Sequence, residues 1–420
     1  MNRRIVVLIA TMTCAWILAG CTTARSLPGG DASADQSLAR ILVTFDDKTI
    51  QRAVSAGTTG DYAARTSYTN SGWSRRIANT IARRHALRIL AQWPMTALGV
   101  SCVVYQVDGV QDVEQLLDAL AADEHVGSAQ RMGEFRTLQT ETNAAARRLP
   151  EGLESMQYSD PYLPLQTAFR TLHIDQWHTR ASGRGIRIAL IDSGVDTHHP
   201  DLEGQVKRSE NLAPSEPGNA LNDVHGTAVA GVLSAVAGNG IGIAGIAPDA
   251  EIFAFRACWP DGATAASARC NTFTLAMALN EAIRLRSHII NLSLSGPDDT
   301  ILRLLIERAL QQGIVVVAAV PEHKEDGGFP ANLPGVLAVT GNAGGDSEQI
   351  VAPGSDILTT VPRSGYEFMS GSSFATAHVA GLAALMLELH PRWSAADIRD
   401  AMLDPAGPMH GHPDDITAIQ

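Results

Sequence analysis

Three side chains in the sequence could together carry out nucleophilic catalysis. Asp192 follows the apolar run of residues 186–191, His225 comes 33 positions later, and Ser373 precedes an apolar helical stretch. A hydroxyl nucleophile, an imidazole that takes its proton and a carboxylate that orients the imidazole are what acyl transfer requires. An aspartate that ends a strand would by itself be read as a turn residue. The set of three favours a catalytic role.

The elements around these residues must bring them to one place. Apolar strand-like runs alternate with helical stretches from residue 160 to residue 420, which predicts a doubly wound, mostly parallel α/β sheet covered by helices on both faces. In such sheets functional residues lie at the carboxyl ends of strands, where Asp192 is expected. Ser373 is predicted to begin a helix, whose free N–H groups favour a developing oxyanion.

The segments around these residues resemble the subtilisin-like (subtilase) family of serine proteases. They are an Asp-Ser-Gly strand end at Asp192, a His-Gly-Thr helix start at His225 and a Gly-Ser-Ser helix start before Phe374, with further similarity at residues 245–248 and 291–297. The resemblance implies a serine endopeptidase with catalytic Asp192, His225 and Ser373, acting on protein or peptide substrates through an acyl-enzyme. It also implies that one strand pairs with the substrate backbone, formed by Ser293, Leu294, Ser295 and Gly296.

The sequence departs from the family at the oxyanion site. In most relatives a strand like residues 313–319 is followed by a glycine and then by an asparagine that stabilises the oxyanion, whereas Glu322 stands there in this chain. An ionised glutamate has no hydrogen-bond donor and would repel the charge that forms. Candidates for a replacement donor are Asn332, His323 and Lys324. The departure leaves open a second interpretation, a protease-fold binding module with weak or self-limited activity.

Residues 41–138 predict a separate, smaller domain. Their pattern is strand, helix, strand, strand, helix, strand, which indicates a ferredoxin-like α+β fold. Asp112 is the expected N-cap of its second helix, and Cys102 is expected in its core. The resemblance implies that this domain is a propeptide that inhibits the protease intramolecularly, as in a zymogen. Residues 139–159 lack periodicity and would form a linker that contains the processing site.

The N-terminal residues predict export and lipid anchoring. Arg3 and Arg4 precede an apolar run, which ends in Leu-Ala-Gly before Cys21. This order resembles a bacterial lipobox, so residues 1–20 are expected to be a signal peptide, Cys21 to be lipidated, and residues 21–40 to form a flexible tether. The protein would then be held at a bacterial membrane, and propeptide cleavage would allow release of the peptidase domain.

The net charge and the positions of the cysteines bear on possible partners and cofactors. A net charge of −12 provides no basic field for nucleic acid, so no such partner is expected. Cys258 and Cys270 flank a short Gly/Ala/Ser-rich stretch and either form a disulfide or remain as two thiols. Neither has neighbours that suggest a metal site, and no cofactor is expected. Family members often bind calcium, but the resemblance identifies no ligands in this chain.

Overall fold

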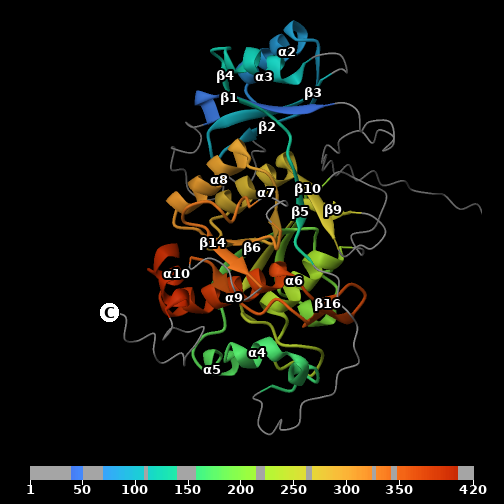
Figure 1. Cartoon of the computed structure of the whole chain (residues 1–420), viewed down its shortest axis with the longest axis vertical. Coiled ribbons are helices and arrows are strands. Elements are labelled where there is room, and N and C mark those ends of the chain that lie inside the picture. Colours follow the sequence, from blue (N-terminus) through green and yellow to red (C-terminus); the bar gives the residue numbers. More distant parts are fainter. Residues whose placement is uncertain are drawn as a thin grey trace, which may run out of the picture.

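The computed structural model describes most of the chain from residue 39 to residue 404. The described ranges are 39–50, 70–107, 112–139, 158–213, 223–261, 267–323, 328–341 and 348–404. The predicted signal peptide, the lipidation site Cys21 and most of the tether and linker lie outside them. Figure 1 shows a smaller N-terminal body at one end of the molecule and a larger body below it.

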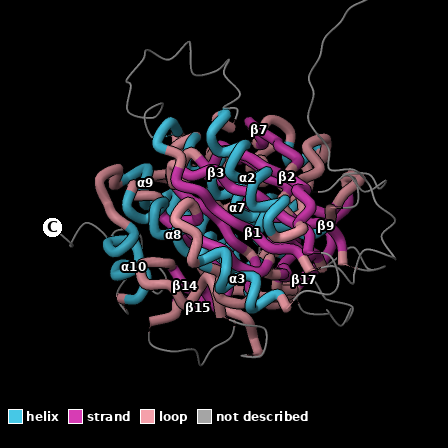
Figure 2. The backbone as a smooth tube through the Cα atoms, turned by 90° about the horizontal axis from the view of Figure 1, so that it is seen from above, coloured by secondary structure: helices cyan, strands magenta, loops and turns pink. Residues whose placement is uncertain are grey.

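The N-terminal body is a four-stranded antiparallel sheet with the strand order β2-β3-β1-β4. Helices α2 and α3 lie over its outer face (Figures 1 and 2), and the Asp112 side chain caps α3 as expected, by accepting from the Glu114 N–H. Cys102 is fully buried. The order of elements and strands is that of the predicted ferredoxin-like fold. The elements are β1 (Arg40–Asp46), α2 (Gly72–Arg84), β2 (Leu87–Met95), β3 (Val100–Val107), α3 (Val113–Ala121) and β4 (Val126–Arg131).

The larger body confirms the predicted doubly wound α/β fold. Its seven strands are parallel, in the order β15-β14-β13-β11-β6-β8-β7. The strands are β6 (Arg187–Asp192), β7 (Val206–Asn211), β8 (Glu251–Arg256), β11 (Ile289–Leu292), β13 (Val315–Ala319), β14 (Leu337–Thr340) and β15 (Ile350–Val351).

Helices cover both faces of this sheet because alternate residues of its strands face opposite sides. In β6, Ile188 and Leu190 pack with α6 and α9, whereas Ala189 and Ile191 pack with α7 and α8. Helix α9 is apolar and long enough to cross a membrane, but 89% of its apolar stretch is buried, as in the core helix of a globular domain. The helices are α4 (Thr167–Thr171), α5 (Ile174–Trp177), α6 (Val224–Ser234), α7 (Thr272–Arg284), α8 (Thr300–Gln311), α9 (Ser372–Leu389) and α10 (Ala395–Leu403).

A second, smaller sheet connects the two bodies. Its order is β12-β5-β10-β9, and all its pairs are antiparallel. Strand β5 follows the N-terminal body in sequence but leaves that body's sheet, and its partners among the described strands belong to the larger body. The members are β5 (Glu134–Thr137), β9 (Cys258–Pro260), β10 (Ala268–Asn271) and β12 (Leu294–Ser295), and a separate hairpin is formed by β16 (Ile357–Val361) and β17 (Gly365–Met369).

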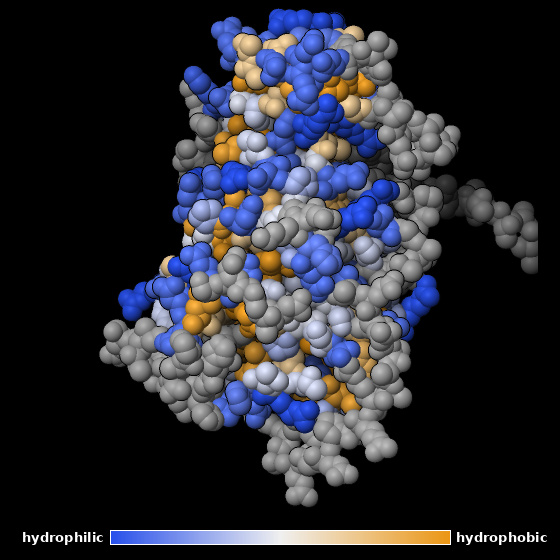
Figure 3. Space-filling view, viewed as in Figure 1, coloured by the Kyte–Doolittle hydropathy of each residue, from blue (hydrophilic) through white to orange (hydrophobic). Residues whose placement is uncertain are grey.

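The surface of the molecule is mostly hydrophilic on the side shown in Figure 3. Figure 3 shows hydrophilic residues over much of one side, including the end formed by α2 and α3, with smaller apolar areas between them. The inner face of the N-terminal sheet is not exposed, because Leu42, Met95 and Val104 belong to the same buried cluster as residues of α7 and α8. The two bodies therefore share a continuous apolar junction.

Candidate active site

Asp192 and His225 meet at the carboxyl end of β6. His225 Nδ1 donates to Asp192 Oδ1 at 2.8 Å, and the Ser193 backbone N–H donates to the same oxygen at 2.7 Å. Both side chains are almost completely buried. A carboxylate that accepts the Nδ1 proton fixes the imidazole tautomer with Nε2 as the base.

The glycine after His225 allows this close meeting of strand and helix. A Cβ at Gly226 would lie 2.1 Å from the carbonyl oxygen of Gly194, which belongs to the turn after β6. The Gly226 N–H also donates to the Ser193 hydroxyl at 3.1 Å. Any larger residue would push α6, and His225 with it, away from Asp192.

An ion pair holds the start of α6 from the other side. Arg256, at the end of β8, donates through Nε to the Asp223 carboxylate at 2.7 Å, and Asp223 is the N-cap residue of α6. Burial raises the pKa of Asp223 to about 6, while the Arg256 guanidinium opposes that rise. Since Arg256 is also the strand neighbour of Asp192, this pair ties the His225 helix to the strand that carries Asp192.

Ser373 occupies the first turn of α9, as the sequence predicts. Its Oγ donates to the carbonyl oxygen of Ser293 at 3.0 Å. The neighbouring Phe374 ring lies 6.0 Å from the His225 ring, centroid to centroid, which brings the start of α9 beside the imidazole. His225 Nε2 is buried without a hydrogen-bond partner among the described residues. The serine hydroxyl is thus held by Ser293 and not by the imidazole.

A buried polar chain that the sequence did not reveal supports this serine position. Asn291 donates through Nδ2 to the Ser293 hydroxyl at 2.9 Å, and that hydroxyl donates to the Ser373 carbonyl oxygen at 3.1 Å. By resemblance the sequence predicts a substrate-binding strand in this segment, and nothing in its pattern indicates a contact with the nucleophile. The alternation Asn-x-Ser on a buried strand was the available signal.

Strand β5 lies in the position expected for a substrate. It pairs with β10 on one side and with β12 on the other, and the residue after it, Leu138, reaches Ser373. The Leu138 N–H faces the Ser293 carbonyl oxygen at 3.3 Å and Ser373 Oγ at 3.2 Å, and the Leu138 carbonyl oxygen accepts from the Ser373 N–H at 3.3 Å. A backbone N–H at this oxygen is the type of donor that stabilises an oxyanion.

Two glycines make room for this strand. A Cβ at Gly371, where φ is +146°, would lie 2.3 Å from the Leu138 carbonyl oxygen. A Cβ at Gly296 would lie 2.3 Å from the ring of Phe135, which is 1% exposed and packs 6.1 Å from the Phe329 ring. Gly296 itself forms a β-bridge with Phe329. These contacts shape a site for an extended chain with a large apolar residue at the Phe135 position.

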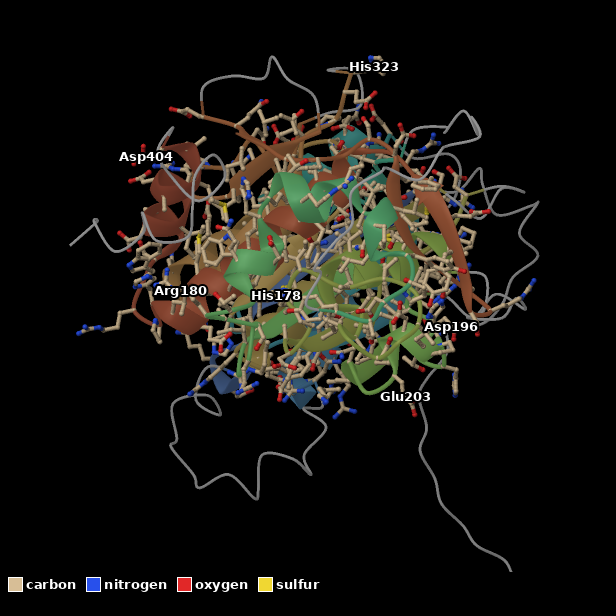
Figure 4. The ribbon with its side chains drawn as sticks, turned by 90° about the horizontal axis from the view of Figure 1, so that it is seen from below. His178, Arg180, Asp196, Glu203, His323 and Asp404 are labelled. Atoms are coloured by element: carbon tan, nitrogen blue, oxygen red, sulfur yellow. A yellow bond between two sulfur atoms is a disulfide. The ribbon has the colours of Figure 1, made fainter. Side chains whose placement is uncertain are left out.

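The predicted oxyanion region lies at the surface. Glu322 and His323 are exposed, Asn332 is exposed as well, and Lys324 lies outside the described residues. Figure 4 shows His323 at the periphery of the molecule. Among the described residues, the Ser373 N–H donates to the Leu138 carbonyl oxygen. Of the candidate replacement donors that the structure describes, neither His323 nor Asn332 donates to that oxygen.

The two predicted cysteines, and a buried histidine on the nucleophile helix, have structural partners. Cys258 and Cys270 form a disulfide, so the predicted bridge is present. His378, on α9, has Nδ1 3.0 Å from the Pro353 carbonyl oxygen, and burial lowers the pKa of this histidine to about 4. Within the described part of the chain, no group of three or more His, Cys, Asp or Glu side chains could hold a metal ion.

The doubly wound α/β fold and the positions of these side chains fit the serine peptidase class. A family profile described as "Subtilase family" matches residues 183–415. Subtilisin E from Bacillus subtilis is 36% identical over 262 residues, covering 58% of this chain and 65% of that protein. Subtilisin from Bacillus pumilus is 35% identical, covering 58% of this chain and 90% of its own length.

A solved structure agrees at the level of the fold. Fervidolysin from Fervidobacterium pennivorans, a keratinolytic enzyme related to subtilisin, has a TM-score of 0.65 and 21% identity, covering 91% of this chain and 61% of that one. The chain belongs to the subtilase family. The comparisons favour a peptidase over the alternative of a binding module.

Proposed function

We propose that this chain is the precursor of an exported serine endopeptidase that cuts itself between Leu138 and Gln139. The observation that carries the proposal is the position of Leu138, whose N–H and carbonyl groups contact Ser293 and Ser373 while the strand before it pairs on both sides. A chain held in this way presents its next peptide bond to the serine.

The chemistry follows from the groups around that bond. The Ser373 hydroxyl turns from the Ser293 carbonyl oxygen toward His225, gives its proton to Nε2, and attacks the Leu138 carbonyl carbon. The Ser373 N–H stabilises the oxyanion, and Asp192 stabilises the imidazolium. Return of the proton to the Gln139 nitrogen breaks the peptide bond and leaves an ester between Leu138 and Ser373, which water then hydrolyses.

The test compares two adjacent serines in the purified full-length chain. Ser373→Ala is expected to abolish self-cleavage, because it removes the nucleophile. Ser372→Ala is the matched control: its hydroxyl is buried without a hydrogen-bond partner among the described residues, and its loss is expected to leave cleavage intact. Mass spectrometry should find a new N-terminus at Gln139. Cleavage of the Ser373→Ala chain at this bond, or labelling of that variant by a fluorophosphonate, would contradict the proposal.

We further propose that Glu322 limits turnover. By resemblance, Glu322 occupies the sequence position where most relatives carry asparagine, and the loss of one oxyanion donor typically costs about 10²–10³ in turnover. Glu322→Asn is therefore expected to raise kcat, whereas Glu322→Ala, which removes the charge without adding a donor, should give a smaller gain. A fall in kcat for Glu322→Asn would show that this position shapes another part of the cleft.

We also propose that the exported precursor is anchored through a lipid on Cys21, and that cleavage at Leu138 leaves the lipid on the inhibitory N-terminal domain. The basis is the sequence order of charge, apolar run and cysteine. A fatty-acid probe should label the wild-type chain and Cys14→Ala, and not Cys21→Ala. Labelling of Cys21→Ala would overturn the anchor.

A further inference from the structure

The hydroxyl of Thr137 forms a reciprocal pair of contacts with one backbone residue of the larger body. The Ala268 N–H donates to Thr137 Oγ1 at 2.9 Å, and Thr137 Oγ1 donates to the Ala268 carbonyl oxygen at 3.3 Å. Thr137 is 5% exposed and Ala268 is 1% exposed. A side chain therefore takes the place that a strand backbone would normally occupy in a ladder.

The register of the small sheet explains why Ala268 presents both groups to β5. The ladder between β5 and β10 pairs Arg136 with Arg269 and ends there, one step before Ala268 would meet Thr137. On its other side Ala268 lies opposite Pro260, and the adjacent pair of that hairpin carries the backbone bond from the Asp261 N–H to Ser267. Since hydrogen-bonded and non-hydrogen-bonded pairs alternate along an antiparallel ladder, the N–H and carbonyl groups of Ala268 point toward β5. With β5 in place, the Thr137 hydroxyl accepts from the Ala268 N–H.

The position of Ala268 is fixed by a cross-link two residues away. Cys270 and Cys258 face each other in the β9–β10 register and are joined by the disulfide, and both are fully buried. On the opposite side of β5, Leu294 is the strand partner of Thr137. The donor and acceptor of Ala268 therefore cannot move far to find other partners when a different side chain arrives.

We propose that the Ala268 backbone selects substrates with a hydroxyl residue, threonine or serine, immediately before the residue whose carbonyl group is attacked. This inference rests on the proposed function, because it treats β5 as a bound substrate. Valine has the shape of threonine without the hydroxyl, so it would leave a buried N–H unpaired, and sites built to bond a hydroxyl reject analogues that lack it. The disulfide-bridged hairpin is thus a specificity element as well as an edge for strand pairing.

The first test uses the self-processed wild-type protein and three short peptides. One has the chain's own sequence from Glu134 to Gln139, and the other two carry serine or valine in place of Thr137. We expect kcat/KM for the valine peptide to be about tenfold or more below that for the threonine peptide, with the serine peptide within a few-fold of threonine. Equal or faster cleavage of the valine peptide would overturn the inference.

The second test needs no catalysis. In the full-length Ser373→Ala chain, the hydrogen exchange rate of the Ala268 amide is measured for Thr137, Thr137→Ser and Thr137→Val. We expect Thr137→Val to speed this exchange about tenfold and Thr137→Ser to change it little, because only valine removes the acceptor. An unchanged rate in Thr137→Val would overturn the hydroxyl contact. If no peptide is cut but the exchange rate rises as expected, the proposed peptidase function is refuted. The binding of the Thr137 hydroxyl by the Ala268 backbone then still stands.

Discussion

The body of the N-terminal domain and the strand that follows it contact the peptidase in different ways. Each of these contacts of the body has a side chain on at least one side: the Trp93 ring packs edge-on against Phe273 at 4.6 Å, and the Asn280 side chain on α7 accepts from the Ala97 N–H at 2.9 Å. Strand β5 uses its backbone, which pairs with peptidase strands on both sides. Side-chain packing can adjust to small changes, whereas a backbone held between two strands and two glycines cannot.

For the proposed precursor, the comparison separates two properties. The body should determine how long the domain stays docked, and β5 should determine whether and where the chain is cut. Variants in the body are therefore expected to leave cleavage nearly unchanged, and variants in β5 to leave docking nearly unchanged.

The largest effect is expected at Gly371. Gly371→Ala places a Cβ where the Leu138 carbonyl oxygen lies and strains a backbone at φ +146°. Since misplacement of a reacting group by about 1 Å can cost about 10²-fold, self-cleavage should slow at least a hundredfold. The matched control is Gly72→Ala in the N-terminal body, where the nearest atom to the new Cβ is 3.6 Å away. Thermal unfolding of both variants separates a local clash from a folding defect, and wild-type cleavage by a folded Gly371→Ala chain would contradict the geometry.

The next effect concerns the Phe135 site. Phe135→Ala removes a fully buried ring, worth about 1.5–3 kcal/mol of burial, so the cleavage rate should fall roughly ten- to hundredfold. Gly296→Ala should slow cleavage as well, because the new Cβ meets that ring. In the double variant the two losses should not add, since the alanine at 135 relieves the clash. Additive losses in the cleavage assay would show that the ring and the glycine act separately.

Asn280 should affect docking and not cleavage. Its Oδ1 accepts from the Ala97 N–H at 2.9 Å and from the Thr96 hydroxyl at 3.3 Å. Asn280→Ala leaves both donors without this acceptor, which should speed separation of the cleaved fragments about tenfold. Asn280→Asp keeps an acceptor and is the control. The measurement is the rate at which the two fragments separate after cleavage; a slower cut in Asn280→Ala would instead link docking to catalysis.

The smallest effect is expected at Asp261. Its carboxylate lies 3.6 Å from the guanidinium of Arg136 in β5, but the Arg136 side chain is 70% exposed. Exposed ion pairs contribute little, so Asp261→Asn should slow cleavage only about twofold. The difference should vanish in high salt, where such pairs are screened. A salt-independent loss would mean that Asp261 acts through the hairpin backbone.

Much of the fold and of the candidate site followed from local sequence patterns. The apolar runs predicted the parallel sheet because strands buried on both faces must be apolar throughout, as at Leu190 and Ile191. The segments at His225 and Ser373 predicted helix starts, and both helices begin there. The spacing of Cys258 and Cys270 indicated a bridge but could not exclude free thiols; their opposed positions in one hairpin supply the missing geometry.

The partners of β5 could not be predicted. Periodicity reports which face of a strand is buried, but the choice between the N-terminal sheet and the smaller sheet that contains β10 and β12 depends on pairing across more than a hundred residues. The contact of Ala268 could not be predicted for another reason: nearly all residues have an N–H and a carbonyl group, and only the tertiary structure shows that the Thr137 hydroxyl contacts both groups of Ala268. The Ser373–Ser293 contact likewise depends on tertiary geometry.

The connection between the body and β5 has a consequence for the cleaved chain. Only Met132 and Gly133 separate β4 from β5; the Met132 N–H donates to Arg40 in the body, and the Gly133 N–H donates to the Thr272 hydroxyl in the peptidase. After the bond breaks, the new carboxyl end would still be carried by a docked body, at an effective concentration in the millimolar range typical of short linkers. A free peptide at micromolar concentration would compete poorly against it. The time before the peptidase accepts outside substrates would then be set by the loss of the body from α7 and α8, and not by the cut itself.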